Sequence, residues 1–197
     1  MLKFNFCVAI DLLENKDVHA ILGPQTSEEA EFLVHLGDKA RVPIVTFSVT
    51  TPFLSQEKTP YLVRVAINDK AQVKAIAAIV QAFRWRQVTL IHEDSNYGNG
   101  VIPYLIGAHE EIDSRVPHRS VISLRATDDQ ITIELQKLMT MSTRVFVVHM
   151  SSSLASRFFL KAKELGMMSK GYAWIITDGI MSILNSMDPQ SLTQCKG

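Results

Sequence analysis

Two short runs of β-branched residues, separated by a helical pattern, constrain the fold of this chain more than any other feature. The first run covers residues 18–22 and ends in a Gly-Pro turn, and the second covers residues 42–47 and ends in a hydroxyl-rich turn. Apolar residues at helical spacing fill residues 26–40 between them. Strand, helix and strand in this order are typical of an open α/β sheet, where ligands bind at the carboxyl ends of the strands. The sequence therefore predicts a binding fold.

The alternation of helix and strand continues through the rest of the chain. We expect further helices over residues 5–15, 69–83, 101–112, 127–141 and 151–165, a turn over 93–100, and further strands over 61–66, 88–92, 121–124, 145–149 and 173–177. Strands joined by helical crossovers lie parallel, so the predicted fold class is α/β, with βαβ units and mostly parallel sheets. The size of the repeating unit changes after Ala66. This change predicts a lobe boundary, with residues 1–66 in one lobe and residues 67–197 in the other.

The composition excludes several classes of protein. Of the 197 residues, 47% are hydrophobic and 20% are charged, as in a globular protein rather than a disordered one. The 20 basic residues balance the 20 acidic ones, so the chain lacks the excess of positive charge that is typical of proteins that bind nucleic acid. No apolar run approaches the roughly 18 residues that span a bilayer. Asn5 and Asp11 interrupt the N-terminal segment, so we expect neither an export signal nor a membrane anchor in this chain.

The common motifs for nucleophilic, zinc and thiol chemistry are missing from the sequence. The stretch Gly98–Gly100 follows a strand, as a dinucleotide loop would, but Pro103 stands at the third glycine position. The run Gly166–Gly171 resembles part of a phosphate loop, but Tyr172 stands where lysine is required. We therefore predict no catalytic residue and no cofactor, and an α/β enzyme is the less favoured alternative to a binding protein.

Histidines and cysteines do not form a recognisable metal site. His92 and His149 both end strands, but no carboxylate pattern accompanies them, which favours bonds to backbone or water over a metal. The methionines at residues 139, 141, 167 and 168 have the spacing of helix packing. Cys7 and Cys195 fit no metal-ligand spacing, and whether they are free or joined in a disulfide stays open.

Polar residues gather where the predicted strands end. These groups are Gln25–Ser27, Ser48–Thr51, Glu93–Tyr97, Ser151–Ser153 and Thr177–Asp178. Helix capping and turn formation explain many of them. Hydroxyl groups and helix N-terminal N–H groups that meet in one cleft would also suit a small anion such as a carboxylate. Both interpretations stay open, although the collective placement favours binding more than any single residue does.

Long stretches of the chain resemble the extracellular amino-terminal domain of plant ionotropic glutamate receptor-like channels. The stretches that carry the resemblance are 11–15, 20–27, 36–40, 42–44, 47–48, 51–52, 126–130, 138–141, 143–153 and 176–179. The resemblance implies a type I periplasmic-binding-protein fold, in which two α/β lobes close on a ligand. It also implies that this chain is a fragment, with lobe one incomplete because its opening strand and its returning segment are missing, and lobe two nearly complete.

The resemblance further implies a ligand site for an amino acid or a related small carboxylate. A hydroxyl-rich loop in lobe one would hold the ligand together with acids and a tyrosine of lobe two. On this sequence the ligand-binding residues implied are Ser48, Thr50, Thr51, Asp69, Tyr97 and Asp178. Gln25 stands where amino-acid receptors commonly have serine, so recognition of the carboxylate is expected to differ here.

The function implied is ligand sensing by a ligand-gated cation channel of the plasma membrane. This domain would lie outside the cell, would reach the membrane only through domains absent from the chain, and would assemble with other receptor subunits. A soluble binding module without a channel, and a truncated gene product without function, are the alternatives.

Overall fold

The computed structural model describes residues 2–24, 26–54 and 59–180. The chain divides into two compact units, Met1–Ala71 and Gln72–Gly197, which are described separately below. No helix among the described residues is both long enough and apolar enough to cross a lipid bilayer.

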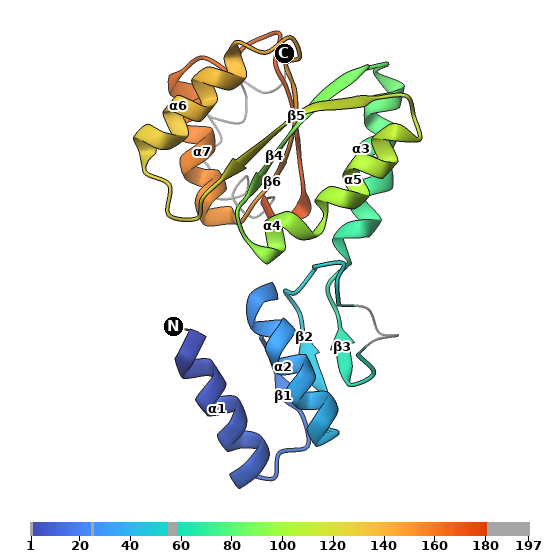
Figure 1. Cartoon of the computed structure of the whole chain (residues 1–197), viewed down its shortest axis with the longest axis vertical. Helices are drawn as coiled ribbons and strands as arrows, with labels where there is room; N and C mark the ends of the chain where they lie inside the picture. Colours follow the sequence, from blue (N-terminus) through green and yellow to red (C-terminus); the bar gives the residue numbers. More distant parts are fainter. Residues whose placement is uncertain (1, 25, 55–58, 181–197) are drawn as a thin grey trace. The chain divides into compact units, whose positions relative to one another are not determined.

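The first unit is built around a small parallel sheet (Figure 1). It comprises helix α1 (Leu2–Asn15), strand β1 (Ile21–Leu22), helix α2 (Ser27–Ala40), strand β2 (Ile44–Thr46) and strand β3 (Leu62–Arg64). The strands lie in the order β1-β2-β3, and all pairs are parallel, as predicted. Thr26 caps α2 by accepting a hydrogen bond from the backbone N–H of Glu29, as expected for a threonine before two glutamates.

Only one face of this small sheet is buried. Ile21, Ile44 and Leu62 are aligned across the three strands and form the core with residues of α2. The next row points the other way, where Leu22 is 77% exposed and Val63 is 45% exposed. The buried strand expected over residues 18–22 is confirmed only in part, because β1 has only two residues and they face opposite sides.

The second unit is a parallel sheet with helices on both faces. Its elements are α3 (Asp69–Ala82, which begins in the first unit), β4 (Gln87–Glu93), α4 (Asn96–Gly100), α5 (Ile102–Glu110), β5 (Arg115–Ile122), α6 (Asp128–Met139), β6 (Val145–His149), α7 (Ser152–Glu164) and β7 (Ala173–Ile176). The strand order is β5-β4-β6-β7. Figure 1 shows α3 and α5 on one face of the sheet and α6 and α7 on the other.

Side chains along the central strands β4 and β6 point alternately to the two faces of the sheet, so each face has its own hydrophobic core. Leu90 and Val147 pack with residues of α3 and α5, whereas Ile91, Phe146 and Val148 pack with residues of α6 and α7. All five side chains are at most 1% exposed, and each contributes about 1.5–3 kcal/mol through burial. A sheet covered on both faces explains why every residue of β6 except His149 is apolar.

Two segments of the second unit differ from the prediction. Strand β5 begins at Arg115, not at residue 121, because its outer position in the sheet tolerates polar residues and Pro117. The register slips by one residue there, since Gln87 pairs with Arg115 and Thr89 pairs with His118. The predicted turn over residues 93–100 contains the short helix α4, which Ser95 caps by accepting from the N–H of Gly98.

Burial disfavours the charged form of two histidines of this unit. His92 is 4% exposed and His109 is fully buried. Burial lowers the pKa of both imidazoles below their ordinary value of 6.5. The Nδ1 atom of His109 lies 2.6 Å from the carbonyl oxygen of Leu105, and its Nε2 atom has no partner among the described residues. An imidazolium at this position would therefore carry an N–H group without an acceptor.

We expect the free energy of unfolding to fall as the pH drops below about 6.5, the value at which histidine gains its proton in the unfolded chain. Above that pH neither state binds the proton, and below it the unfolded state binds more protons than the folded state. The free energy of unfolding therefore falls by at most about 1.4 kcal/mol per pH unit for each histidine. Urea unfolding between pH 7.5 and pH 5 measures this, and His109→Met should flatten the dependence. His35→Met, at an exposed histidine, is the matched control and should leave the pH dependence unchanged. If His109→Met also leaves the pH dependence of the free energy of unfolding unchanged, His109 is not one of the groups that cause it.

Candidate functional site

Polar side chains of the second unit meet where strands β4, β6 and β7 end. The three strands are neighbours and parallel, so their carboxyl ends lie at one edge of the sheet. Glu93 ends β4, His149 ends β6, and Thr177 follows β7. All three residues are buried. Parallel pairing therefore gathers chemistry from three distant parts of the sequence at one place.

The buried carboxylate of Glu93 ties two of these strand ends together. Its Oε1 atom accepts a hydrogen bond of 2.6 Å from the hydroxyl of Ser95, and its Oε2 atom accepts one of 2.6 Å from the backbone N–H of Ser151. Ser151 stands at the N-cap of α7 and makes no side-chain capping bond. Ser151 thus stands at the cap position expected for the group Ser151–Ser153, while the carboxylate of Glu93 binds the N–H group at this helix N-terminus.

His149 fixes the position of Tyr97. One ring nitrogen, Nδ1, lies 2.9 Å from the hydroxyl of Thr177, and the other, Nε2, lies 3.2 Å from the carbonyl oxygen of Tyr97. The two rings are in contact, with centroids 4.3 Å apart. His149 thus bonds to backbone, as the sequence favoured, and also to the hydroxyl of Thr177.

The turn after β7 closes against the same tyrosine. A Cβ atom at Gly179 would overlap the hydroxyl of Tyr97, so only glycine permits this approach. Asp178, between Thr177 and Gly179, is exposed, and its backbone N–H donates a 2.7 Å hydrogen bond to Oε1 of Gln72. No hydrogen bond or ion pair of the Asp178 carboxylate is found among the described residues. This turn therefore presents an exposed carboxylate beside a positioned phenol.

The first unit has its own polar loop after β2. The hydroxyl of Thr46 donates to the carbonyl of Pro24 at 3.0 Å and accepts from the N–H of Val49 at 3.3 Å, which shapes the loop. The hydroxyl of Thr50 donates to Oδ2 of Asp69 at 2.7 Å, and the N–H of Asp69 donates to the carbonyl of Thr50 at 3.0 Å. Asp69 is 1% exposed, so this pair joins the loop to the first turn of α3.

Arg64 and Thr51 lie in the same loop region. The guanidinium of Arg64 donates to the carbonyls of Thr51, at 3.0 Å, and of Leu54. Burial lowers the pKa of Arg64, and the charge of Asp69 partly offsets this. The hydroxyl of Thr51 is buried and has no hydrogen-bond partner among the described residues. Among the described residues there is no cluster of histidine, cysteine, aspartate or glutamate that could hold a metal ion.

Comparison with known proteins assigns the chain to a family. The family model for the receptor family ligand binding region matches residues 7–196. The chain belongs to this family. Glutamate receptor 2.2 of Arabidopsis thaliana is 50% identical over 189 residues, which is 96% of this chain and 20% of that protein. Glutamate receptor 2.7 of the same plant is 52% identical over 178 residues, which is 90% of this chain and 19% of that protein.

The chain thus spans about a fifth of the length of the curated relatives it matches. A solved solute-binding protein of an ABC transporter from Rhodopseudomonas palustris, in complex with 3,4-dihydroxybenzoic acid, superposes with a TM-score of 0.85. The alignment covers 96% of this chain and 52% of that protein at 19% identity. The ligand-binding region therefore has the predicted type I periplasmic-binding-protein-like α/β fold.

The structure brings together some of the residues implied by the resemblance. Thr50 and Asp69 are hydrogen-bonded in the first unit, and Tyr97 lies against the turn that contains Asp178 in the second. Ser48 is exposed in the loop of Thr50. Their ligand-binding role stays a prediction. So do the lobe boundary at residues 66–67 and the expectations for Gln25 and Cys195, two residues that lie outside the described ones. Cys7 is exposed and forms no disulfide with any described residue.

Sequence reasoning missed three residues that organise these sites. Gln72 and Arg64 carry no motif, because their roles depend on contacts with distant backbone. Glu93 is named above only as a member of the polar group Glu93–Tyr97, but it is 3% exposed and joins two strand ends. The available signal is a glutamate directly after the expected strand 88–92, because a carboxylate buried at a strand end needs hydrogen-bond partners.

We expect Glu93→Gln to lower the free energy of unfolding by about 1–3 kcal/mol, because an amide cannot accept hydrogen bonds at both of its terminal atoms. Urea unfolding monitored by circular dichroism measures the change. The exposed Glu111→Gln serves as control and should stay within about 0.5 kcal/mol of the parent chain. Equal stability of the two variants would show that the carboxylate of Glu93 does not hold the strand ends together.

Proposed function

We propose that this chain is the ligand-sensing part of a glutamate receptor-like, ligand-gated cation channel, and that it binds an amino acid or a related small carboxylate. The observation that carries the proposal is the identity of 50% over 189 residues to a plant glutamate receptor. In this proposal the domain lies outside the plasma membrane and works by binding rather than catalysis. Lobe closure is the proposed mechanism, in which higher affinity for the closed state shifts a conformational equilibrium.

The chemistry at the carboxyl edge of the second unit supports this ligand class. An α-amino acid carries an ammonium group. The exposed carboxylate of Asp178, which forms no ion pair among the described residues, is a suitable partner for it. The phenol of Tyr97 is fixed beside that turn by His149 and Gly179, so it can donate or accept a hydrogen bond without reorganising. In the first unit, we propose that Ser48 and Thr51 supply hydroxyl groups to a carboxylate, and that Thr50, whose hydroxyl proton goes to Asp69, holds this loop in place.

Asp178 offers the cleanest test, because it is exposed and its side chain supports no described contact. Calorimetric titration of the full chain with each of the twenty amino acids should identify at least one that binds saturably. Asp178→Asn should weaken that binding by roughly tenfold or more, the effect of losing one charge-assisted hydrogen bond. The exposed Asp129→Asn on α6 is the matched control and should bind like the parent chain. Saturable binding that Asp178→Asn leaves unchanged would remove this residue from the site.

The channel part of the proposal has a separate test. Rapid amplification of both transcript ends should extend the reading frame upstream into a signal peptide and a further strand. Downstream it should extend into an inner binding domain and a pore, as expected if this region senses ligand for a channel. A transcript that ends at both termini of this chain would contradict the channel function while leaving the ligand-binding fold intact.

A further inference from the structure

A pocket lies in the second unit, at the opposite edge of the sheet from the carboxyl-edge residues Glu93, His149 and Thr177. Its volume is about 660 Å³, within the range of about 300–1,000 Å³ that holds small molecules. Arg86 and Gln87 at the start of β4, and Arg115 and Val116 at the start of β5, line it. Because all four strands are parallel, their amino ends share this edge, and no residue of the pocket belongs to the carboxyl-edge cluster.

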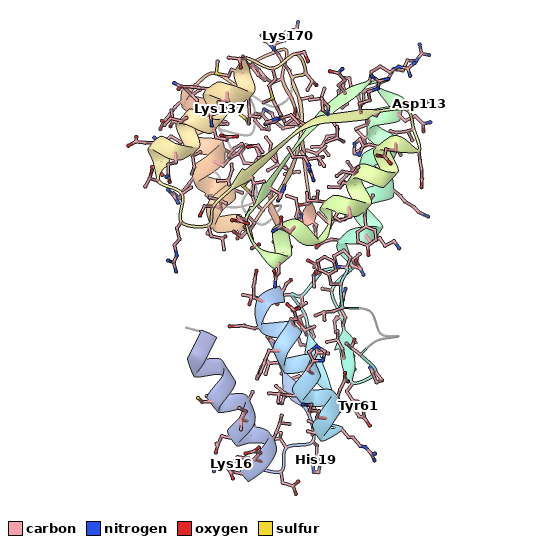
Figure 2. All side chains as sticks on the ribbon, viewed as in Figure 1. Lys16, His19, Tyr61, Asp113, Lys137 and Lys170 are labelled. Carbon is pink, nitrogen blue, oxygen red and sulfur yellow. The ribbon has the colours of Figure 1, made fainter. Side chains whose placement is uncertain are left out.

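Charges of both signs surround this amino-edge pocket. Arg86 and Arg115 arise from adjacent backbone, since the N–H of Arg115 donates to the carbonyl of Arg86 at 2.9 Å. Glu110 and Asp113 come from the end of α5, where the N–H of Asp113 donates to the carbonyl of Glu110 at 3.2 Å. Figure 2 shows Asp113 where α5 gives way to β5.

None of these four side chains forms an ion pair among the described residues. The ion pairs found there are Lys137–Glu134, Arg157–Asp128 and Lys161–Glu164, all elsewhere in this unit. Two cations and two anions that line one pocket without neutralising each other suit a ligand that carries both charges. A purely anionic ligand would meet two carboxylates, and a purely cationic one would meet two guanidinium groups.

A buried hydroxyl in the pocket wall also lacks a partner. Ser114 is 3% exposed, lines the pocket, and its Oγ atom makes no hydrogen bond among the described residues. Its backbone is held in place, because its N–H donates to the carbonyl of His109 at 2.9 Å. Buried polar atoms are nearly always paired in folded proteins, and leaving one unpaired costs about 1–3 kcal/mol. A bound ligand would satisfy this hydroxyl.

We propose that the amino-edge pocket binds a zwitterionic small molecule larger than a free amino acid, of the size of a short peptide. The guanidinium groups of Arg86 and Arg115 take its anionic group, the carboxylates of Glu110 and Asp113 take its cationic group, and the hydroxyl of Ser114 hydrogen-bonds to its polar backbone. Ile106 and Val116 supply apolar contact between the two charged walls. This site is separate from the proposed function, so either can fail without the other.

The test uses the full chain and three tripeptide probes followed by calorimetry. Trialanine with free ends carries both charges, N-acetyl-trialanine carries only the anion, and trialanine amide carries only the cation. The free tripeptide should bind saturably, and each capped form should bind roughly tenfold more weakly or worse, because each lacks one charge-assisted contact. Capped forms that bind as tightly as the free tripeptide, or no saturable binding of any probe, would overturn the proposal.

Variants locate the binding within the molecule. Arg86→Gln and Glu110→Gln should each weaken binding of trialanine by roughly tenfold, whereas Arg125→Gln, an exposed arginine outside the pocket, should not. Asp178→Asn should also leave this binding unchanged, which separates it from binding at the carboxyl edge. Ser114→Ala adds a readout that a purely structural role would not give, since it should weaken binding while the melting temperature of the free chain stays equal or rises. Trialanine affinity that Arg86→Gln and Glu110→Gln leave unaltered would overturn the site.

Discussion

Parallel strand pairing is the constraint on which the rest of this molecule depends. Every strand pair in both sheets is parallel, so all carboxyl ends of a sheet lie at one edge and all amino ends at the other. In the second unit, helices cover both faces, and apolar side chains alternate between two cores. With both faces used for stability, polar chemistry is confined to the two edges.

The carboxyl edge shows how such an arrangement is kept rigid. A buried carboxylate, Glu93, joins the end of β4 to the start of α7, and a buried imidazole, His149, joins β6 to β7 and to Tyr97. These internal hydrogen bonds satisfy the groups that hold the edge, whereas Asp178 keeps its carboxylate exposed. The division is physically reasonable, because a ligand site needs fixed supports and a few groups that are still available for bonding.

Much of the fold could be predicted from the sequence because its signals are local. Thr127 and Gln130 form the capping box that starts α6, and the apolar run of β6 has the predicted bounds Val145–His149. The predictions that were wrong concern residues whose structure depends on contacts with distant parts of the chain. Strand β5 is an edge strand with Pro117 and alternating polar residues, so its first half lacks an apolar signal. Leu22 is apolar but exposed, because its orientation follows from pairing with β2.

The candidate sites were predictable only in part, for the same reason. Residues at strand ends could be named from their order in the chain, but their hydrogen bonds to Gln72 or Arg64 depend on distant backbone positions. The amino-edge pocket has no motif, since its charges come from the starts of two strands and the end of a helix.

The most direct test of the central claim, that ligand binds at the carboxyl edge of the parallel sheet, is a nuclear magnetic resonance titration of the isotope-labelled chain. An amino acid shown to bind should be added while backbone amide shifts are followed. The account predicts saturable shifts that cluster at Tyr97, Gly98 and Thr177–Gly179. Saturable shifts confined to residues away from these strand ends would contradict it.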